Sequence, residues 1–532
     1  MRDFFKIKSC LSLLLCICLF LTQSCSKPQS DNKDTLILQL GGEPSILNPI
    51  LSTDLPSSQV EDLIYSGLFR VNADLQLETD LLERYTVEPD GKTYVFFLKK
   101  NVTWHDGVAF TAEDVKFTFE KILDPKTRTV RRGDFIIAGK PIDFEIIDTH
   151  TLKITLPKPY APFLSRISMG IIPKHIYEKE DINTSPHNRH PIGTGPFTFG
   201  EWKSGQHLLL KRNNAYFGDK AKASRILLKI IPDNNTATIA LENGEIDESS
   251  ILGKDYAHYK NHARFDIYRY YGLSYVYLGF NLKHPFFKDV RVRQAISHAI
   301  DKEALVKGVL NGFGMQAHIP SVPALWSYPK AGQFSTYPFS TQKSIALLKE
   351  AGFVLNPKTG VLEKDGKPFE FTLMTNKGNK DREKSAEVIQ QMLKQIGISM
   401  KIQLMEWSAF IKVLNEKKDP KTFDAAMLGW SLGIDPDCYT IWHSSEYPQG
   451  FNFIGYKNPL VDSLLIQGRE EISQEKRKKI YENLYSEISK DSPYVFLFFS
   501  ENLHGINKRV NGLSKPGPAG LMTKIENIYL QN

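Results

Sequence analysis

The stretch Phe371–Met405, FTLMTNKGNKDREKSAEVIQQMLKQIGISMKIQLM, decides the fold class of this 532-residue chain. Its middle carries apolar residues at the spacing of one helix face, and Gly397 ends that helix. Residues 398–404 then alternate between apolar and polar, which is the period of a half-buried strand. Across residues 352–433 the succession is strand, helix, strand, helix, strand, and this predicts an α/β lobe. The helical stripe consists of Ala386, Ile389, Leu393 and Ile396.

The α/β pattern leads into Phe423–Ser445, FDAAMLGWSLGIDPDCYTIWHSS, which contains a possible catalytic motif. Residues Gly429–Gly433 read G-x-S-x-G, the nucleophile elbow of serine hydrolases, and they follow a predicted strand. An elbow needs its helix to begin directly after the serine, so that backbone amides can form an oxyanion hole. Here the predicted helix begins only at Pro436. Hydrolysis through Ser431 is therefore kept as a remote alternative, and no enzyme activity is predicted.

The same stretch also places an aromatic residue and two carboxylates at the end of a strand. Trp430, Asp435 and Asp437 together form a surface suited to a cationic or amphipathic small ligand. Asp435 has a second interpretation, because aspartate is a favoured cap for a helix that begins at the following proline. Both interpretations of Asp435 remain open at the level of the sequence.

Length and composition are those of a large globular protein. At roughly 100–200 residues per domain, the chain predicts about three units or two interwoven lobes. The net charge of +7 is too small to predict nucleic-acid binding. The one dense basic run, Lys476–Lys479, is predicted to be the solvated face of a helix. Beyond the first twenty-five residues Cys438 is the only cysteine, so we predict no intramolecular disulfide.

The first residues differ in character from the rest of the chain. A basic start precedes the apolar run Leu11–Leu21, which is about half of the ~20 residues that a spanning helix needs. Residues 1–24 are therefore predicted to be a signal peptide. Leu21–Cys25 resembles a bacterial lipobox, with Thr22 where an aliphatic residue is usual. We expect lipidation at Cys25 and a tether over residues 25–32.

Several motifs recur in a characteristic order along the chain. Thr111 and Asp114 form a predicted capping box at the start of a helix. The segment Gly193–Phe197, GTGPF, is predicted to be a turn between strands, because Pro196 replaces the helix of a dinucleotide fingerprint. The ordered motifs are Trp104–Gly107, Thr111–Phe117, Gly193–Phe197, Arg212–Phe217, Arg291–Ala295 and Ala299–Lys302.

This set of motifs resembles the solute-binding proteins of oligopeptide and dipeptide ABC transporters, whose relatives bind nickel, glutathione or haem-type ligands. The resemblance implies two α/β lobes around a ligand cleft, with an extra domain packed on the first lobe. The lobes would be joined by hinges at Tyr275–Asn281 and near Pro493. The implied boundaries are 33–56, 190–274 and 494–532 for the first lobe, 57–189 for the extra domain and 275–493 for the second lobe.

The resemblance also implies the function. The protein would be an exported, lipid-anchored receptor of the periplasm or cell-envelope surface that captures short peptides by hinge closure. It would deliver them to the permease and ATPase subunits of an ABC importer, acting as a monomer without a cofactor or metal. The alternative keeps the fold and replaces the peptide with a nickel complex, a glutathione-like ligand or another small solute.

The family pattern assigns roles to individual residues. An aspartate that receives the ligand ammonium is expected three residues after Trp430, but Gly433 stands there, so Asp435 or Asp437 is the expected substitute. Lys377 is the candidate partner of the ligand carboxylate. The further candidates for the cleft wall are Trp407, Tyr275, Asn281, Glu43 and Asn48.

Overall fold

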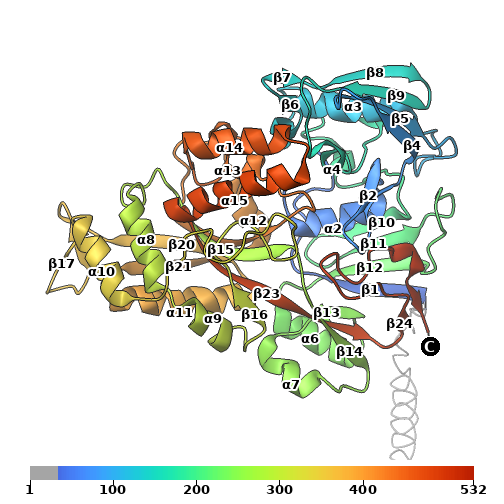
Figure 1. The fold of residues 1–532 in the computed structure, drawn as a ribbon. Helices are drawn as coiled ribbons and strands as arrows, with labels where there is room; N and C mark the ends of the chain where they lie inside the picture. Colours follow the sequence, from blue (N-terminus) through green and yellow to red (C-terminus); the bar gives the residue numbers. More distant parts are fainter. Residues whose placement is uncertain (1–33, 532) are drawn as a thin grey trace, which may run out of the picture.

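The computed structural model describes residues 34–531, so the predicted signal peptide and Cys25 lie outside the described residues. A four-stranded sheet forms the first lobe, and an eight-stranded sheet forms the second lobe and extends into the first (Figure 1). Within the described chain no helix is long and apolar enough to cross a membrane. The predicted α/β fold with two lobes is confirmed.

The first lobe is built on a four-stranded sheet in the order β1-β12-β11-β10. β1 and β12 are parallel, whereas the other two pairs are antiparallel. Helix α2 packs near β10, so its residues 57–64, expected in the extra domain, are described with the first lobe, and helix α6 packs against β13. The bounds are β1 Thr35–Leu40, β10 Phe197–Lys203, β11 His207–Arg212, β12 Arg225–Ile230, α2 Leu55–Ile64 and α6 Asn234–Asn243.

The extra domain contains a four-stranded antiparallel sheet in the order β4-β5-β9-β8, with helix α3 packed on it. Thr111 and Asp114 form the predicted capping box of α3. One hydrophobic core runs through both this domain and the first lobe, so the two form one body. The main bounds are β4 Leu82–Val87, β5 Thr93–Leu98, β8 Asp143–Asp148, β9 Thr151–Thr155, α3 Ala112–Leu123 and α4 Phe163–Arg166.

The second lobe is a three-layer unit, because separate cores cover the two faces of its sheet. The predicted succession is confirmed: β20, α11, β21, α12 and β22 follow one another. The bounds are α8 Val290–Ala299, α9 Lys302–Gly308, α10 Thr341–Glu350, β20 Glu370–Asn376, α11 Lys380–Gln395, β21 Ser399–Met405, α12 Trp407–Leu414, β22 Ala425–Ser431, α13 Tyr439–Trp442, α14 Pro459–Glu470 and α15 Gln474–Asp491.

Strand β23, Tyr494–Asn507, is shared by the two halves of the molecule (Figure 1). Its first part pairs with β15, Ser274–Phe280, in the second lobe. Its last part pairs with β14, Phe265–Tyr271, and with β13, Glu248–Ser250. One chain crossing therefore lies within a continuous strand, and the other lies at the two residues Gly272 and Leu273 between β14 and β15.

The boundary expected at residue 494 differs from the structure. Residues 494–499, expected in the first lobe, pair with β15 and pack in the cores of the second lobe. The apolar run reads as a complete strand in the sequence, but β23 continues through a more polar segment as far as Asn507. The crossing lies after Phe499, beyond the hinge expected near Pro493.

The GTGPF motif is a turn that packs closely on α2. The Gly195 N–H donates to the Ile64 carbonyl at 2.8 Å. A Cβ on Gly193 would lie 1.9 Å from the same oxygen, so a side chain cannot be accommodated without moving backbone. Glycine is therefore required here for backbone contact. The segment leads into β10 but follows the short 3-10 helix Pro186–Asn188, so the expectation of a turn between two strands is wrong.

Candidate functional site

Strand β22 carries the G-x-S-x-G segment to the surface without forming a nucleophile elbow. Ser431 is the last residue of β22, and the next helix, α13, begins only at Tyr439. Within residues 34–531, the Ser431 hydroxyl makes no hydrogen bond to a histidine. The helix expected from Pro436 is also wrong in position. The segment between strand and helix is a loop. Asp435 Oδ1 accepts a hydrogen bond from the Asp437 N–H, and Asp437 Oδ1 accepts one from the Tyr439 N–H.

Asp435 is bound by an arginine of helix α15. Both guanidinium Nη atoms of Arg477 donate to its carboxylate, at 2.8 and 2.9 Å. Arg477 is only 5% exposed, so the basic run in which it lies is not wholly a solvated face. The capping interpretation of Asp435 is wrong, because α13 starts at Tyr439 and has no side-chain cap. The Asp435 carboxylate is therefore engaged within the protein.

Asp437 is the centre of a buried ionic network between the second lobe and the extra domain. Arg469 Nε contacts both of its carboxylate oxygens, at 3.0 and 3.1 Å, and Arg166 donates from the extra domain at 2.9 Å. Arg469 also contacts Asp134 of the extra domain at 2.8 Å. Burial opposes ionisation of Asp437, yet Arg469 and Arg166 hold its pKa well below the usual range. The network therefore links the two bodies on one side of the molecule.

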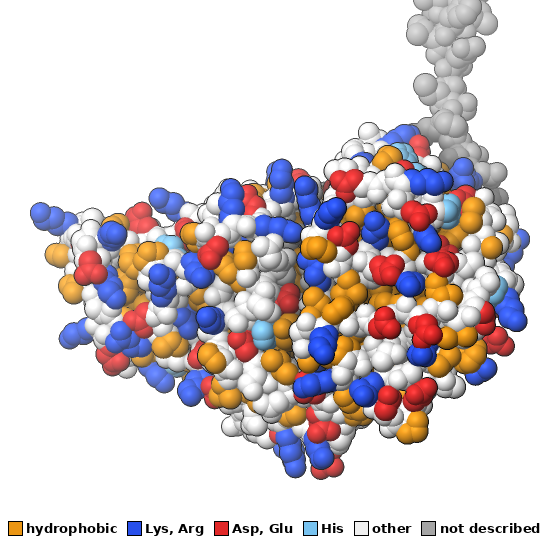
Figure 2. Space-filling view, turned by 90° about the horizontal axis from the view of Figure 1, so that it is seen from above, with side chains coloured by type: hydrophobic (Ala, Val, Ile, Leu, Met, Phe, Trp, Pro, Cys, Tyr) orange, Lys and Arg blue, Asp and Glu red, His pale blue; other side chains and the backbone are white. Residues whose placement is uncertain are grey.

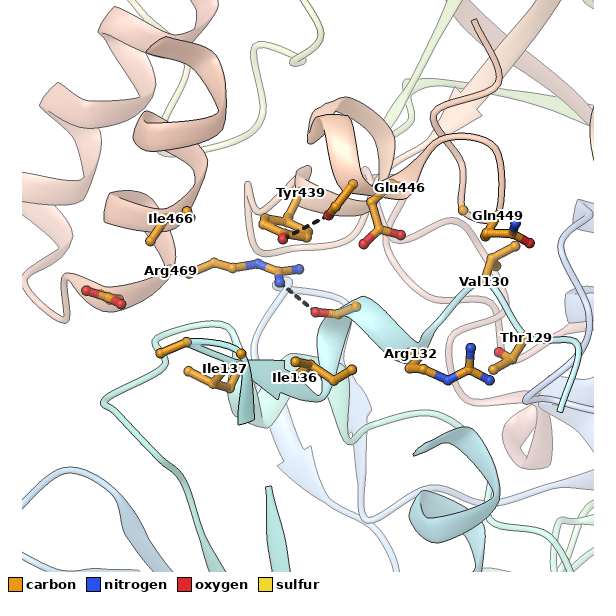
Figure 3. Close-up of a pocket in the computed structure, with 16 residues that line it drawn as sticks. Thr129, Val130, Arg132, Ile136, Ile137, Tyr439, Glu446, Gln449, Ile466 and Arg469 are labelled. Carbon is orange, nitrogen blue, oxygen red and sulfur yellow. Dashed lines mark hydrogen bonds between the residues drawn. The ribbon is translucent and has the colours of Figure 1, made fainter. Parts of the chain in front are cut away.

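A cavity of about 400 Å³ lies beside this network. Figure 3 shows Arg469 and Glu446 of the second lobe facing Arg132 and Ile136 of the extra domain across it. Burial raises the pKa of Glu446 to about 8, and the neighbouring Asp134 acts in the same direction. Because its walls are the two bodies that the network joins, this cavity belongs to their interface.

The two candidate tryptophans have different environments. Trp430 is stacked between Tyr277 and Phe453, with ring centroids 6.3 and 5.7 Å away, and its Nε1 is buried without a partner. Trp407 reaches the first lobe, where its Nε1 donates to Asp54 at 3.4 Å. Trp407 thus lies where the lobes meet, whereas Trp430 supports the aromatic layer beneath the end of β22.

Four other candidates have structural roles in the described chain. Tyr275 is 1% exposed and packs in the core of the second lobe. The Asn281 amide donates to two backbone carbonyls of the segment that leads to β22. Glu43 accepts from Trp202 Nε1 and from a backbone amide, and Asn48 is fully buried and donates to Asn188. The contacts of Asn281, Glu43 and Asn48 use the polar groups that a ligand would need, whereas the buried Tyr275 hydroxyl has no partner in the described chain.

Lys377, the expected cation, remains a candidate for a ligand, and Arg382 is a second candidate that was not expected. Lys377 is exposed, and its amino group makes no ion pair within residues 34–531. Arg382, at the start of α11, has a buried Nε without a partner, and its guanidinium lies 5.8 Å from the Trp407 ring. Burial lowers the pKa of Arg382 to about 10. Sequence reasoning missed Arg382, because nothing in the helix pattern distinguishes it from a surface arginine.

A second, larger cavity lies between the first lobe, the extra domain and the loop that follows β22. Its volume is about 680 Å³, and Leu432, Gly433 and Ile434 form the wall supplied by the second lobe. Gly433 and Ile434 make no backbone hydrogen bond to the described residues. Their backbone is therefore free to pair with an extended ligand in the manner of an added strand.

Helix α2 places two neighbouring carboxylates in different surroundings. Glu61 is buried and accepts a hydrogen bond from Ser52 at 2.7 Å, whereas Asp62 is open to the large cavity. Burial raises the pKa of Glu61 from 4.5 to about 8, against the Ser52 hydrogen bond. The folded protein thus holds a proton that the unfolded chain releases. Stability then falls as the pH rises from 4.5 to about 8.

Replacing Glu61 with glutamine is expected to stabilise the protein at pH 8 and to have little effect at pH 5. The neutral amide removes the cost of burying a carboxylate, which reaches at most about 1.4 kcal/mol for each pH unit of the window. Thermal unfolding at the two pH values measures the difference. Glu83→Gln, at an exposed position of β4, is the control. Equal shifts of Glu61→Gln at both pH values would contradict the expectation.

The chain is similar along most of its length to known transport proteins. The sequence model of the bacterial extracellular solute-binding proteins, family 5 (middle), matches residues 76–451. The oligopeptide-binding protein AppA of Bacillus subtilis is 36% identical, covering 94% of this chain and 95% of that protein. The solved structure of AppA in complex with a nonapeptide has a TM-score of 0.90 at 35% identity, covering 94% and 99% of the two chains.

Two further solved structures carry other ligands. NikZ from Campylobacter jejuni, in complex with Ni(L-His), is 33% identical with a TM-score of 0.83, covering 93% of this chain and 99% of NikZ. The periplasmic binding protein DppA from Helicobacter pylori, in complex with the peptide STSA, is 27% identical with a TM-score of 0.84, covering 94% and 98%. Similar folds thus hold peptides of different length and a metal chelate.

Proposed function

Because this chain belongs to the bacterial extracellular solute-binding proteins of family 5, we propose that it captures short peptides between its lobes and delivers them to an ABC importer. The family resemblance seen in the sequence motifs is thereby confirmed. The partners would be the permease and ATPase subunits of the importer. Catalysis forms no part of the proposal, since Ser431 lacks the helix of an elbow.

One observation supports a peptide in particular. The 680 Å³ cavity has a free backbone edge at Gly433 and Ile434, which directly follow β22. Main-chain hydrogen bonds to such an edge are independent of ligand side chains, so they suit peptides of varied sequence. AppA and DppA, which were solved with peptides, share this fold over most of their length. Arg382 on the second lobe, whose Nε has no partner in the described chain, is a candidate cation for a ligand carboxylate, although it does not line this cavity.

The proposed location is the periplasm or the cell-envelope surface. The leader and the lipobox-like Leu21–Cys25 support export and tethering through Cys25, and both precede the described residues. Figure 2 shows basic and acidic side chains interspersed over one face of the protein. Such a surface has no basic stripe on that face to attract a nucleic acid. We propose that the protein acts as a monomer.

Peptide capture is expected to be visible in the purified protein. Native mass spectrometry of protein from recombinant cells should detect co-purified peptides, and a nonapeptide library should raise the unfolding temperature of the stripped protein. Exposed Lys349 on α10, replaced by alanine, is a control that should leave both results unchanged. Absence of bound peptide together with absence of a thermal shift would contradict the proposal. Bound nickel without peptide would instead favour a chelate, as in NikZ.

A further inference from the structure

The loop wall of the large cavity lacks the carboxylate that a ligand ammonium needs. Gly433 lines the cavity, and a Cβ added there would meet nothing within 4 Å. An aspartate at this position would fit, so steric crowding does not explain the glycine. The neighbouring Asp435 and Asp437 are bound by arginines of the second lobe and the extra domain. A ligand ammonium in the cavity would therefore need a carboxylate from another part of the cavity wall.

Four carboxylates of the opposite wall line the same cavity: Asp62, Asp80, Glu248 and Glu526. Glu526 is paired with Arg70 at 3.0 Å, and Glu248 lies 3.1 Å from His504. Asp80 is only 7% exposed and lies near Arg70 and Lys99. The Asp62 carboxylate has no hydrogen bond or ion pair within the described chain. It is also the only one of the four whose side chain is exposed.

The Asp62 side chain is accessible from the cavity and is also partly surrounded by protein. It lies on α2 with Gln59 and Leu63, which also line the cavity, so this face of the helix points into it. Surrounding protein raises the pKa of Asp62 to about 6, and the nearby charge of Arg131 acts in the opposite direction. The group is therefore largely ionised at neutral pH. A partly desolvated and unpaired anion in a cavity gains more from a cationic partner than one in open water does.

Resting on the proposed function, we propose that Asp62 receives the ligand ammonium from the first lobe, in place of an aspartate at Gly433. The ligand class is then a peptide with a free amino terminus or another primary ammonium of similar size. The anion and the free backbone edge lie on opposite walls of one cavity, so a bound peptide would contact both lobes. Selection for the charged terminus depends on a residue that is distant in sequence from the β22 loop.

Two nonapeptide libraries test this assignment, one with free amino termini and one N-acetylated. Binding of each library is measured by native mass spectrometry for the wild type, Asp62→Asn and the double variant Asp62→Asn/Gly433→Asp. The wild type should favour the free library by about tenfold to a hundredfold, the range of a charge-assisted hydrogen bond. Asp62→Asn should lose this preference, and Gly433→Asp should restore it in the double variant. Asp74→Asn, at an exposed site outside the cavity, controls for net charge and should keep the preference.

The outcomes separate this inference from the proposed function. If Asp62→Asn retains the preference for free termini, or if the wild type binds both libraries equally, the role of Asp62 is wrong and peptide capture stands. If the wild type binds neither library, peptide capture itself is wrong. Thermal unfolding verifies that each variant is folded, and Asp62→Ala serves as the second variant if the amide disturbs α2.

Discussion

Asp437→Asn is expected to destabilise the protein by about 3–5 kcal/mol, because it removes the central anion of a buried network. Of the ion pairs described for Arg469 and Arg166, only those with Asp134 would then remain. The Asp437 side chain is fully buried, so water cannot replace the lost partner. Since Arg166 and Asp134 belong to the extra domain, the loss weakens the contact between the two bodies as well as the loop after β22. A lower unfolding temperature and a larger radius of gyration by X-ray scattering are the expected measurements.

A surface ion pair between the same two bodies provides the matched control. Lys158 of the extra domain and Glu470 of α14 are 2.9 Å apart, with side chains 51% and 33% exposed. Exposed pairs contribute about 0–1 kcal/mol, so Glu470→Gln should change neither measurement appreciably. An Asp437→Asn protein that unfolds and scatters like the wild type would show that the network does not hold the bodies together.

Gly193→Ala is expected to cost about 3 kcal/mol or more, at the upper end of the effect of overpacking. The added Cβ would meet the Ile64 carbonyl at 1.9 Å, and a backbone atom cannot move away as a side chain does. The same change would disturb the hydrogen bond from Gly195 to that carbonyl. Urea unfolding monitored by tryptophan fluorescence measures the loss, and the yield of soluble protein should fall with it.

Gly41 offers the control for the loss of a glycine. An added Cβ there meets nothing within 4 Å, and the residue is exposed. Gly41→Ala should therefore stay within about 0.5 kcal/mol of the wild type, as surface substitutions usually do. Equal stability of the Gly193 and Gly41 variants would mean that the turn and α2 can separate without cost.

Local patterns in the sequence predicted most of the fold. The capping box at Thr111 fixes the start of α3 because its partners are three residues apart. The stripe of α11 and the alternation of β21 are likewise properties of neighbouring residues. The end of β23 was missed, because its last part is stabilised by pairing with β14 and β13, which lie far away in the sequence.

The candidate site was predicted less well, because its chemistry depends on distant partners. Asp435 and Asp437 have the composition of a ligand site, but Arg477 and Arg469 of the C-terminal helices neutralise them. Nothing near either aspartate in the sequence indicates these partners. Asp62 was not among the predicted site residues, because an acidic residue on a short helix is usually solvated. Only the folded chain brings it to the same cavity as Gly433.

The sharing of β23 has a consequence for how the chain reaches its native state. Strands β13, β14, β15 and β16 (Gly314–Gln316) all pair with β23, yet they precede it by some 180 residues or more along the chain. During synthesis the amino terminus of the chain emerges first. These strands therefore remain without this pairing partner until β23 has been synthesised. Both halves of the molecule are then completed by the same late event. A chain cut short before Tyr494 would leave several strand edges unpaired at once, which makes the C-terminal segment the last requirement for folding of the whole protein.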